Sequence, residues 1–141
     1  MIRELTQSDV YTIRHINALS LGYDVPLELA ERQFVRCTSS KHHILLVHEE
    51  NQEVTGYIHA QVYESLYSDS GLNIIGLAVL PEYQGNGIGS LLLEAIENIA
   101  KDRGYSFIRL NSAEHRTQAH CFYEQNGFLS DKLQKRFIKY L

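Results

Sequence analysis

Three alternating glycines, Gly85, Gly87 and Gly89, separate an apolar run from an amphipathic pattern in the middle of this chain. The run from Ile74 to Leu80 ends at Pro81 and is far shorter than a membrane span, so it predicts a buried strand. Beyond the glycines, apolar residues recur at helical spacing up to a capping glycine, Gly104. These residues are Ile88, Leu91, Leu92, Ala95, Ile96 and Ile99. The pattern predicts a strand, a glycine loop and a helix.

Glycines at the start of a helix have a physical use. Without Cβ atoms the backbone can take positive φ, and successive N–H groups then point into one concavity at the positive end of the helix dipole, which suits a phosphate. The alternative is a tight turn that only needs flexible residues. A Walker A loop is excluded because no lysine follows the glycines, and a dinucleotide fingerprint is disfavoured because Ser90 occupies the position of its third glycine.

The rest of the chain predicts a single α/β domain with a mixed sheet: antiparallel N-terminal strands, then a parallel β-α-β crossover, with helices on both faces. The first helix is expected after Thr6, with a buried stripe of Val10, Ile13, Ile16 and Leu19, and the second carries Leu29, Ala30 and Phe34. The expected strands are 2–5, 43–49, 54–63, 74–80, 107–111 and 137–141; the expected helices are 6–19, 26–37, 88–103 and 116–125; a turn is expected at 68–71.

Composition excludes several classes of protein. The 141 residues are 44% hydrophobic and 21% charged, as in ordinary globular domains, and a net charge of −4 gives no basic field for nucleic acid. No stretch resembles a membrane span or a signal peptide. Cys37 and Cys121 lack a CxxC partner, which predicts reduced thiols and a cytoplasmic protein. None of the seven histidines has the spacing of a known zinc motif, so no metal is expected.

Two motifs together resemble the GNAT superfamily of N-acetyltransferases. Gln84-x-x-Gly87-x-Gly89 is similar to the family's acyl-CoA loop, and the stretch from Ala119 to Phe128 is similar to its second motif, Ala-x-x-Phe-Tyr-Glu-x-x-Gly-Phe. Both occur in the family's order. The resemblance implies one N-acetyltransferase domain over residues 1–141.

The resemblance also implies a reaction and a set of site residues. The expected reaction is transfer of an acetyl group from acetyl-CoA to a primary amine of a small molecule or peptide, by direct attack in a ternary complex. Tyr123 matches the family's tyrosine that meets the departing sulfur, where a phenol of pKa about 10 is a protonated donor at neutral pH. A backbone N–H near Ala78 and Val79 would polarise the acetyl carbonyl. The expected cofactor-binding residues are Leu77, Ala78, Val79, Gln84, Gly85, Asn86, Gly87, Ile88, Gly89, Ser90, Asn111, Arg116, Ala119 and Phe122.

The chain departs from the family pattern at two positions. Some relatives carry a glutamate base where this chain has Asn73, so the base is absent there; Glu64, His59, His120 or a water path are the alternatives. Arg116 stands where many members have asparagine, and it suits a cofactor phosphate, an acidic acceptor group or a surface ion pair. The acceptor would be chosen by residues 19–34 and 63–71.

A second hypothesis is a non-catalytic acyl-CoA-binding sensor or partner module on the same fold, which the missing glutamate keeps open. A homodimer is possible at the level of the family. Binding of nucleic acid or membrane is not expected.

Overall fold

The computed structural model describes residues 1–141, which divide into two compact units, 1–110 and 111–141. The first unit contains all five strands and three helices, and the second contains one helix. None of these helices is both long and apolar enough to cross a membrane. The prediction of a single domain over 1–141 stays a prediction. The strands are β1 (Ile2–Glu4), β2 (His43–Glu50), β3 (Glu53–Ser65), β4 (Ser68–Val79) and β5 (Ile108–Leu110); the α-helices are α1 (Val10–Ile16), α2 (Leu27–Thr38), α3 (Ile88–Asp102) and α4 (Thr117–Gln125); short turns of other helix types are η1 (Gln7–Asp9), η2 (Asn17–Leu21) and η3 (Pro81–Tyr83).

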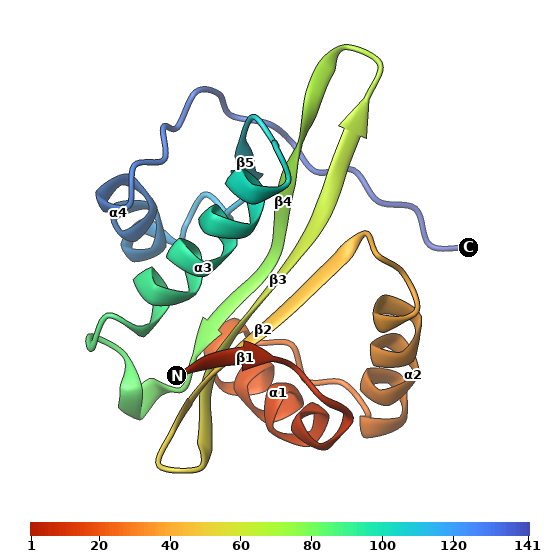
Figure 1. Ribbon diagram of the computed structural model, residues 1–141, viewed down its shortest axis with the longest axis vertical. Coiled ribbons are helices and arrows are strands. Elements are labelled where there is room, and N and C mark those ends of the chain that lie inside the picture. Colours follow the sequence, from red (N-terminus) through yellow and green to blue (C-terminus); the bar gives the residue numbers. More distant parts are fainter. The chain divides into compact units, whose positions relative to one another are not determined.

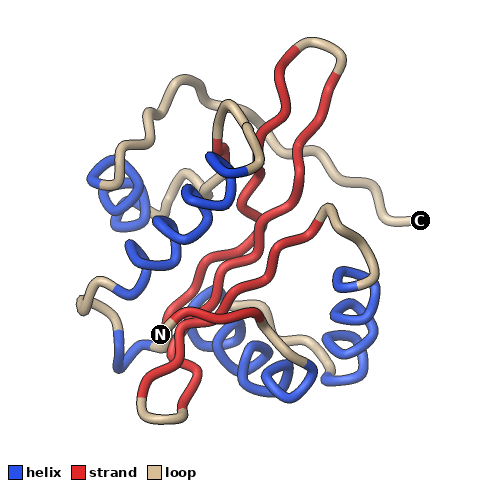
Figure 2. The backbone as a smooth tube through the Cα atoms, in the orientation of Figure 1, coloured by secondary structure: helices blue, strands red, loops and turns tan.

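The first unit is a mixed five-stranded sheet in the order β1-β2-β3-β4-β5 (Figure 1). The first three strand pairs are antiparallel, and β5 pairs parallel with β4 after the crossover through α3. β3 and β4 form the long hairpin in Figure 2. The predicted α/β fold class with an antiparallel N-terminal part and a parallel crossover is therefore confirmed.

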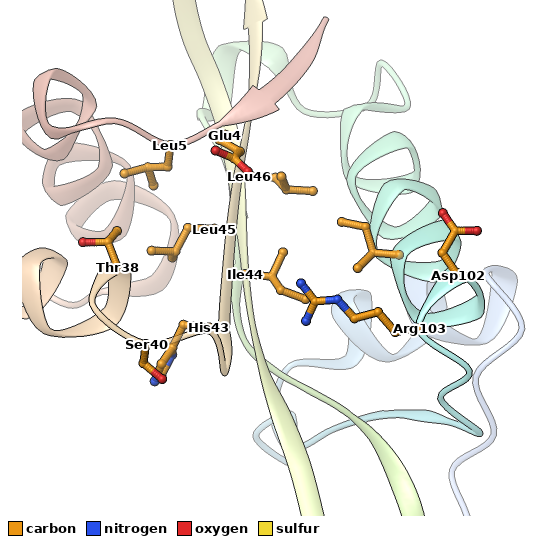
Figure 3. A pocket seen from close by; sticks show the side chains of 11 residues that line it. Glu4, Leu5, Thr38, Ser40, His43, Ile44, Leu45, Leu46, Asp102 and Arg103 are labelled. Carbon is orange, nitrogen blue, oxygen red and sulfur yellow. The ribbon is translucent and has the colours of Figure 1, made fainter.

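Side-chain alternation along the strands explains why helices cover both faces of the sheet. Val47 of β2 and Tyr57 of β3 belong to a buried core, and Leu45 of β2, Ile13 of α1 and Phe34 of α2 pack against it. The intervening residues of β2 point to the opposite face, on the side of α3 (Figure 3). There α3 contributes Ile88, Leu92, Leu93, Ile96 and Ala100, all buried.

The predicted stripe of the first helix is wrong at Leu19, which is 53% exposed. After Ile16 the helix widens into one π-helical turn, η2. Because a π turn holds its hydrogen bonds at i→i+5, the apolar position moves five residues on, and Leu21 packs against the core in its place. Leu29 and Leu91 were likewise predicted in apolar stripes but are 38% and 46% exposed; Leu27 and Leu93 are the inward residues.

Two further predictions are wrong. The expected turn at 68–71 is the start of β4, because Ser65 pairs with Ser68 and closes the hairpin at Leu66 and Tyr67. The expected strand at 137–141 is absent: residues 129–141 form no helix or strand. A strand exists only through hydrogen bonds to a neighbour, and the alternating pattern of this segment carries no information about whether a partner is present.

Asp9 anchors the first turn of the chain. Asp9 is 6% exposed, and its carboxylate accepts two hydrogen bonds from the Arg3 guanidinium, at 2.8 and 3.0 Å, and one from the Thr6 N–H at 2.8 Å. The side-chain hydrogen bonds from Arg3 are the main reason that the pKa of Asp9 lies below its ordinary value of 3.8. The pair ties β1 to the start of the helical segment.

We expect Asp9→Asn to lower the free energy of unfolding at pH 7 by about 2 kcal/mol, because Arg3 loses its buried charged partner. A carboxylate whose pKa is lowered by folding stabilises the fold at pH values above its pKa in the unfolded chain. That contribution is lost as the pH falls through its pKa in the folded protein. The difference between wild type and variant, measured by urea unfolding, should therefore shrink below pH 3.8. Asp24→Asn is the control, because Asp24 is exposed and 3.9 Å from Arg14; a loss as large as that of Asp9→Asn would contradict the assignment.

Candidate functional site in the first unit

The glycine loop has the backbone conformation that its sequence predicts. Gly85 and Gly87 have φ of 83° and 80°, in the left-handed region that other residues adopt only with strain. Gly87 precedes α3, and the first backbone hydrogen bond back into the loop is from Leu91 N–H to Gly87 O, at 3.1 Å. The N–H groups of residues 88–90 therefore have no intrahelical partner. They form a cluster of donors at the positive end of the helix dipole.

Two polar side chains of the loop are used to hold its shape. Gln84 Nε2 donates to Val79 O at 3.0 Å, and Asn86 Nδ2 donates to Tyr83 O at 3.1 Å. Tyr83 in turn donates its hydroxyl proton to Glu53 Oε2 at 2.8 Å. Both Gln84 and Asn86 were predicted as cofactor-binding residues. The structure directs their side-chain amides to main-chain carbonyls, which leaves the backbone N–H groups as the donors available to a ligand.

β4 is paired with a strand on both edges only in a short stretch near its middle. The ladder to β5 covers Leu72 to Ile74 and goes no further. At the same point Ile75 bulges out of the ladder to β3, between Ile74 and Gly76. A bulge bends and twists its strand. No strand pairs with the β5-side edge of β4 from Ile75 to Val79, so this stretch of the edge has unpaired backbone groups.

The register identifies which backbone groups face this unpaired edge. Leu80 N–H donates to Thr55 O at 2.8 Å, and Gly56 lies opposite Val79. In an antiparallel ladder this makes Gly56–Val79 a non-hydrogen-bonded pair, so the N–H and C=O of Val79 point away from β3. By alternation Leu77 shares this direction, whereas Ala78 pairs with β3. Of the two residues expected to supply the polarising N–H, Val79 has the suitable direction.

The loop, the β4 edge and η2 meet at Val79 O. Ser20 Oγ of η2 donates to this carbonyl at 2.7 Å, alongside Gln84. Nearby, Tyr57 donates its hydroxyl proton to Asn17 Oδ1 at 2.6 Å. A Cβ at Gly76 would lie 2.9 Å from the Tyr57 hydroxyl oxygen, so glycine is required for close approach there.

Sequence reasoning missed Asn17, Ser20 and Tyr57, although it placed acceptor choice at residues 19–34. The Ser20 and Asn17 side chains reach the site because of the π turn, which the apolar periodicity did not reveal. The only available signal was a polar residue interrupting the stripe after Ile16.

The first-unit positions that bear on the choice of a base differ in their surroundings. Asn73, where the family base is missing, accepts a hydrogen bond from Arg109 Nη1, and the Cζ atom of Arg109 lies 4.9 Å from the centre of the Tyr63 ring. Burial and the neighbouring His43 lower the pKa of His59 to about 4, so its ring binds a proton weakly. Glu64 is exposed at the β3–β4 hairpin, with Ser70 Oγ 3.4 Å from its carboxylate.

The second unit carries the remaining predicted residues. Arg116 is the N-cap of α4 and lines, with Ala119, a cavity of about 310 Å³ at the start of that helix. Tyr123 packs edge-on against Phe122 and Phe128, with ring centroids 5.3 and 5.7 Å apart. Burial raises the pKa of Tyr123, so its phenol stays protonated at neutral pH.

Two other polar side chains of this unit, Ser112 and His120, have different hydrogen-bonding surroundings. Ser112 Oγ, next to the predicted site residue Asn111, is a buried side-chain oxygen without a hydrogen-bond partner. The imidazole Nε2 of His120 lies 2.9 Å from Ala113 O. The role of His120 as a base stays a prediction.

Comparison with known proteins places these features in context. The model of the acetyltransferase (GNAT) family matches residues 10–128. YhfO of Bacillus subtilis (strain 168), described as an uncharacterized N-acetyltransferase, is 33% identical over 91 residues, a match that covers 62% of this chain and 60% of that protein.

Solved structures resemble the whole chain. A transcriptional regulator from Bacillus halodurans C-125 superposes with a TM-score of 0.86 at 26% identity, over 99% of each chain. AAC(6')-Iy, in complex with the bisubstrate analogue CoA-S-monomethyl-acetylneamine, superposes with a TM-score of 0.86 at 15% identity, over 100% of this chain and 98% of that one.

Proposed function

Because the chain belongs to the GNAT acetyltransferase family, we propose that it transfers an acetyl group from acetyl-CoA to a primary amine of a small molecule or peptide, in a ternary complex. The observation that carries this proposal is the glycine loop with positive φ at Gly85 and Gly87, set beside a β4 edge with no strand partner. The match to YhfO covers 60% of that protein, and the activity is therefore proposed from this chain's own site.

The first unit fits coenzyme A in its charge and hydrogen-bonding groups. The N–H groups of residues 85–90 would bind the pyrophosphate, which is the anion that a helix N-terminus stabilises. The backbone of Leu77 would pair with a pantetheine amide along the unpaired edge, as an added strand would. The Val79 carbonyl already accepts hydrogen bonds from Ser20 and Gln84, which leaves the Val79 N–H for the acetyl group. In the second unit, Ala119 and Phe122 stay assigned by the family motif. Asn111 and Arg116, which lie before that motif in the sequence, stay predicted cofactor-binding residues.

The bound cofactor supplies an acetyl thioester. The chain's part is to stabilise charge and to supply a proton. The Val79 N–H is the donor whose direction suits the carbonyl oxygen as that oxygen gains negative charge. Tyr123 holds a proton on its hydroxyl oxygen at neutral pH, because burial raises its pKa, and this proton can pass to the leaving thiolate.

The acceptor must lose a proton before or during attack, since an amine of pKa about 10.4 is almost fully charged at pH 7. With Asn73 bonded to Arg109 and His59 a weak base, we assign this proton to water rather than to a side chain. Two free cysteines fit the proposal of a cytoplasmic protein.

The proposal is tested by free-thiol release from acetyl-CoA with a panel of small amines, polyamines, aminoglycosides and peptides. We expect release with one chemical class, saturable in both substrates, and intersecting lines in a two-substrate kinetic analysis. Parallel lines would indicate a covalent acetyl-enzyme and would overturn the ternary complex.

The alternative, a non-catalytic acyl-CoA-binding module, is favoured by one observation. The position at which some relatives carry a carboxylate base holds Asn73, which is occupied by Arg109. Cofactor binding by calorimetry, with no thiol release across the panel, would support this second function.

A further inference from the structure

Three metal-binding side chains converge in the first unit, away from the glycine loop. They are Cys37, His43 and His59, and their ligand atoms all lie within 4.8 Å of one another. The two imidazoles are in direct contact, with His43 Nδ1 and His59 Nε2 2.8 Å apart and ring planes inclined at 49°. Neither the proposed acetyl transfer nor the packing of the core uses this cluster.

The strand register explains how residues so far apart in sequence meet. Leu45 lies opposite His59, and His43 lies opposite Gln61, so the two histidines are diagonal neighbours on one face of the β2–β3 ladder. This is the face that α2 covers through Ala30 and Phe34. Cys37 lies in the last turn of that helix, which brings its thiol over the histidine pair.

The type of ligand selects the type of ion. Thiolate and imidazole suit borderline-soft ions such as Zn²⁺ and Co²⁺, whereas Mg²⁺ and Ca²⁺ require oxygen ligands, which this cluster lacks. In a tetrahedral zinc site the bond lengths place neighbouring ligand atoms about 3.3–3.6 Å apart. The histidine nitrogens would therefore separate by about half an ångström from their present contact, a movement within reach of χ rotation.

An ion also needs a route of entry and a fourth ligand. His43 lines an open cavity of about 480 Å³ with Thr38 and Ser40, at the edge of β2 that the short strand β1 leaves uncovered. Figure 3 shows His43 beside Ser40 on the side of the sheet that carries Leu45. The cavity gives solvent access to one ligand of the cluster, as an open coordination position requires.

We propose that Cys37, His43 and His59 form a three-ligand site for one borderline-soft divalent transition-metal ion, such as Zn²⁺, with its fourth position open to this cavity. The ion would tie α2 to β2 and β3. The sequence-based prediction of no metal considered spacing along the chain, and ligands that are 6 and 16 residues apart match no known motif. The register of the β2–β3 ladder and the position of α2 bring the three ligands together instead.

The test is a titration of the full, tag-free chain with Co²⁺. A thiolate ligand to cobalt produces a near-ultraviolet charge-transfer band, and tetrahedral cobalt produces strong visible bands. We expect both to saturate at one ion per chain and to disappear on addition of equimolar Zn²⁺. Absence of the charge-transfer band would overturn the proposal.

Matched variants locate the site. Cys37→Ser should abolish the charge-transfer band, while Cys121→Ser, which alters the other free cysteine, should keep it. His43→Gln and His59→Gln should each weaken cobalt binding at least tenfold, while His42→Gln, at the residue next to His43, should not. Circular dichroism verifies that each variant is folded, and Cys37→Ser decides the question if His59→Gln unfolds. A band retained in Cys37→Ser would overturn the proposal.

Discussion

Gly87→Leu is expected to weaken binding of coenzyme A by about a hundredfold while the chain still folds. A side chain at this position has free space within the protein, because no atom lies within 4 Å of an added Cβ. It would occupy the space in front of the loop's N–H groups, where the pyrophosphate is proposed to bind. Losing two charge-assisted hydrogen bonds costs about 3 kcal/mol, which corresponds to that factor in Kd.

The same helix offers a matched control for this variant. Gly104 follows the C-terminal end of α3 with φ of 74°, and an added Cβ there also meets nothing within 4 Å. Gly104→Leu therefore introduces the same left-handed strain of about 1–2 kcal/mol without touching the loop. Calorimetry should give wild-type affinity for Gly104→Leu. Equal affinity in both variants would refute the assignment of the loop as the phosphate site.

Tyr123→Phe is expected to lower kcat at least about tenfold and to leave the Kd for acetyl-CoA unchanged, because a general acid acts in the transition state. The ring keeps its edge-on contacts with Phe122 and Phe128, so the helix should remain folded. Stopped-flow thiol release, combined with calorimetry of cofactor binding, separates the two constants.

An exposed tyrosine provides the control for that substitution. Tyr140→Phe removes a hydroxyl from a residue that is 84% exposed and should leave kcat unchanged. Unchanged kcat in Tyr123→Phe as well would remove Tyr123 from the mechanism. A change in thermal stability alone, without a change in kcat, would give it only a packing role.

The strand–loop–helix centre could be predicted from sequence because each part has a local cause. Positive φ needs glycine at Gly85 and Gly87, the apolar period marks α3, and Gly104 ends it. The fold class followed from the order of these elements. The family motifs added the expected function, which no local pattern carries.

The remaining features could not be predicted because they depend on contacts between distant segments. Helix propensity and apolar periodicity do not reveal the π turn at 17–21. Leu19 was therefore predicted to point inward, and the hydrogen bond from Ser20 to Val79 O was not foreseen. Which backbone N–H of β4 faces the unpaired edge depends on the register with β3. The meeting of Cys37, His43 and His59 likewise needs the β2–β3 register and the position of α2.

The half of β4 that lacks a second partner has a cost for the protein without ligand. Unpaired strand edges recruit strands from other chains, and the bulge at Ile75 is a feature that makes such recruitment harder by twisting the edge. A ligand that pairs along this edge would satisfy the same backbone groups and would stabilise the fold by mass action. Binding of such a ligand would therefore also reduce the tendency of this edge to pair with strands of other chains.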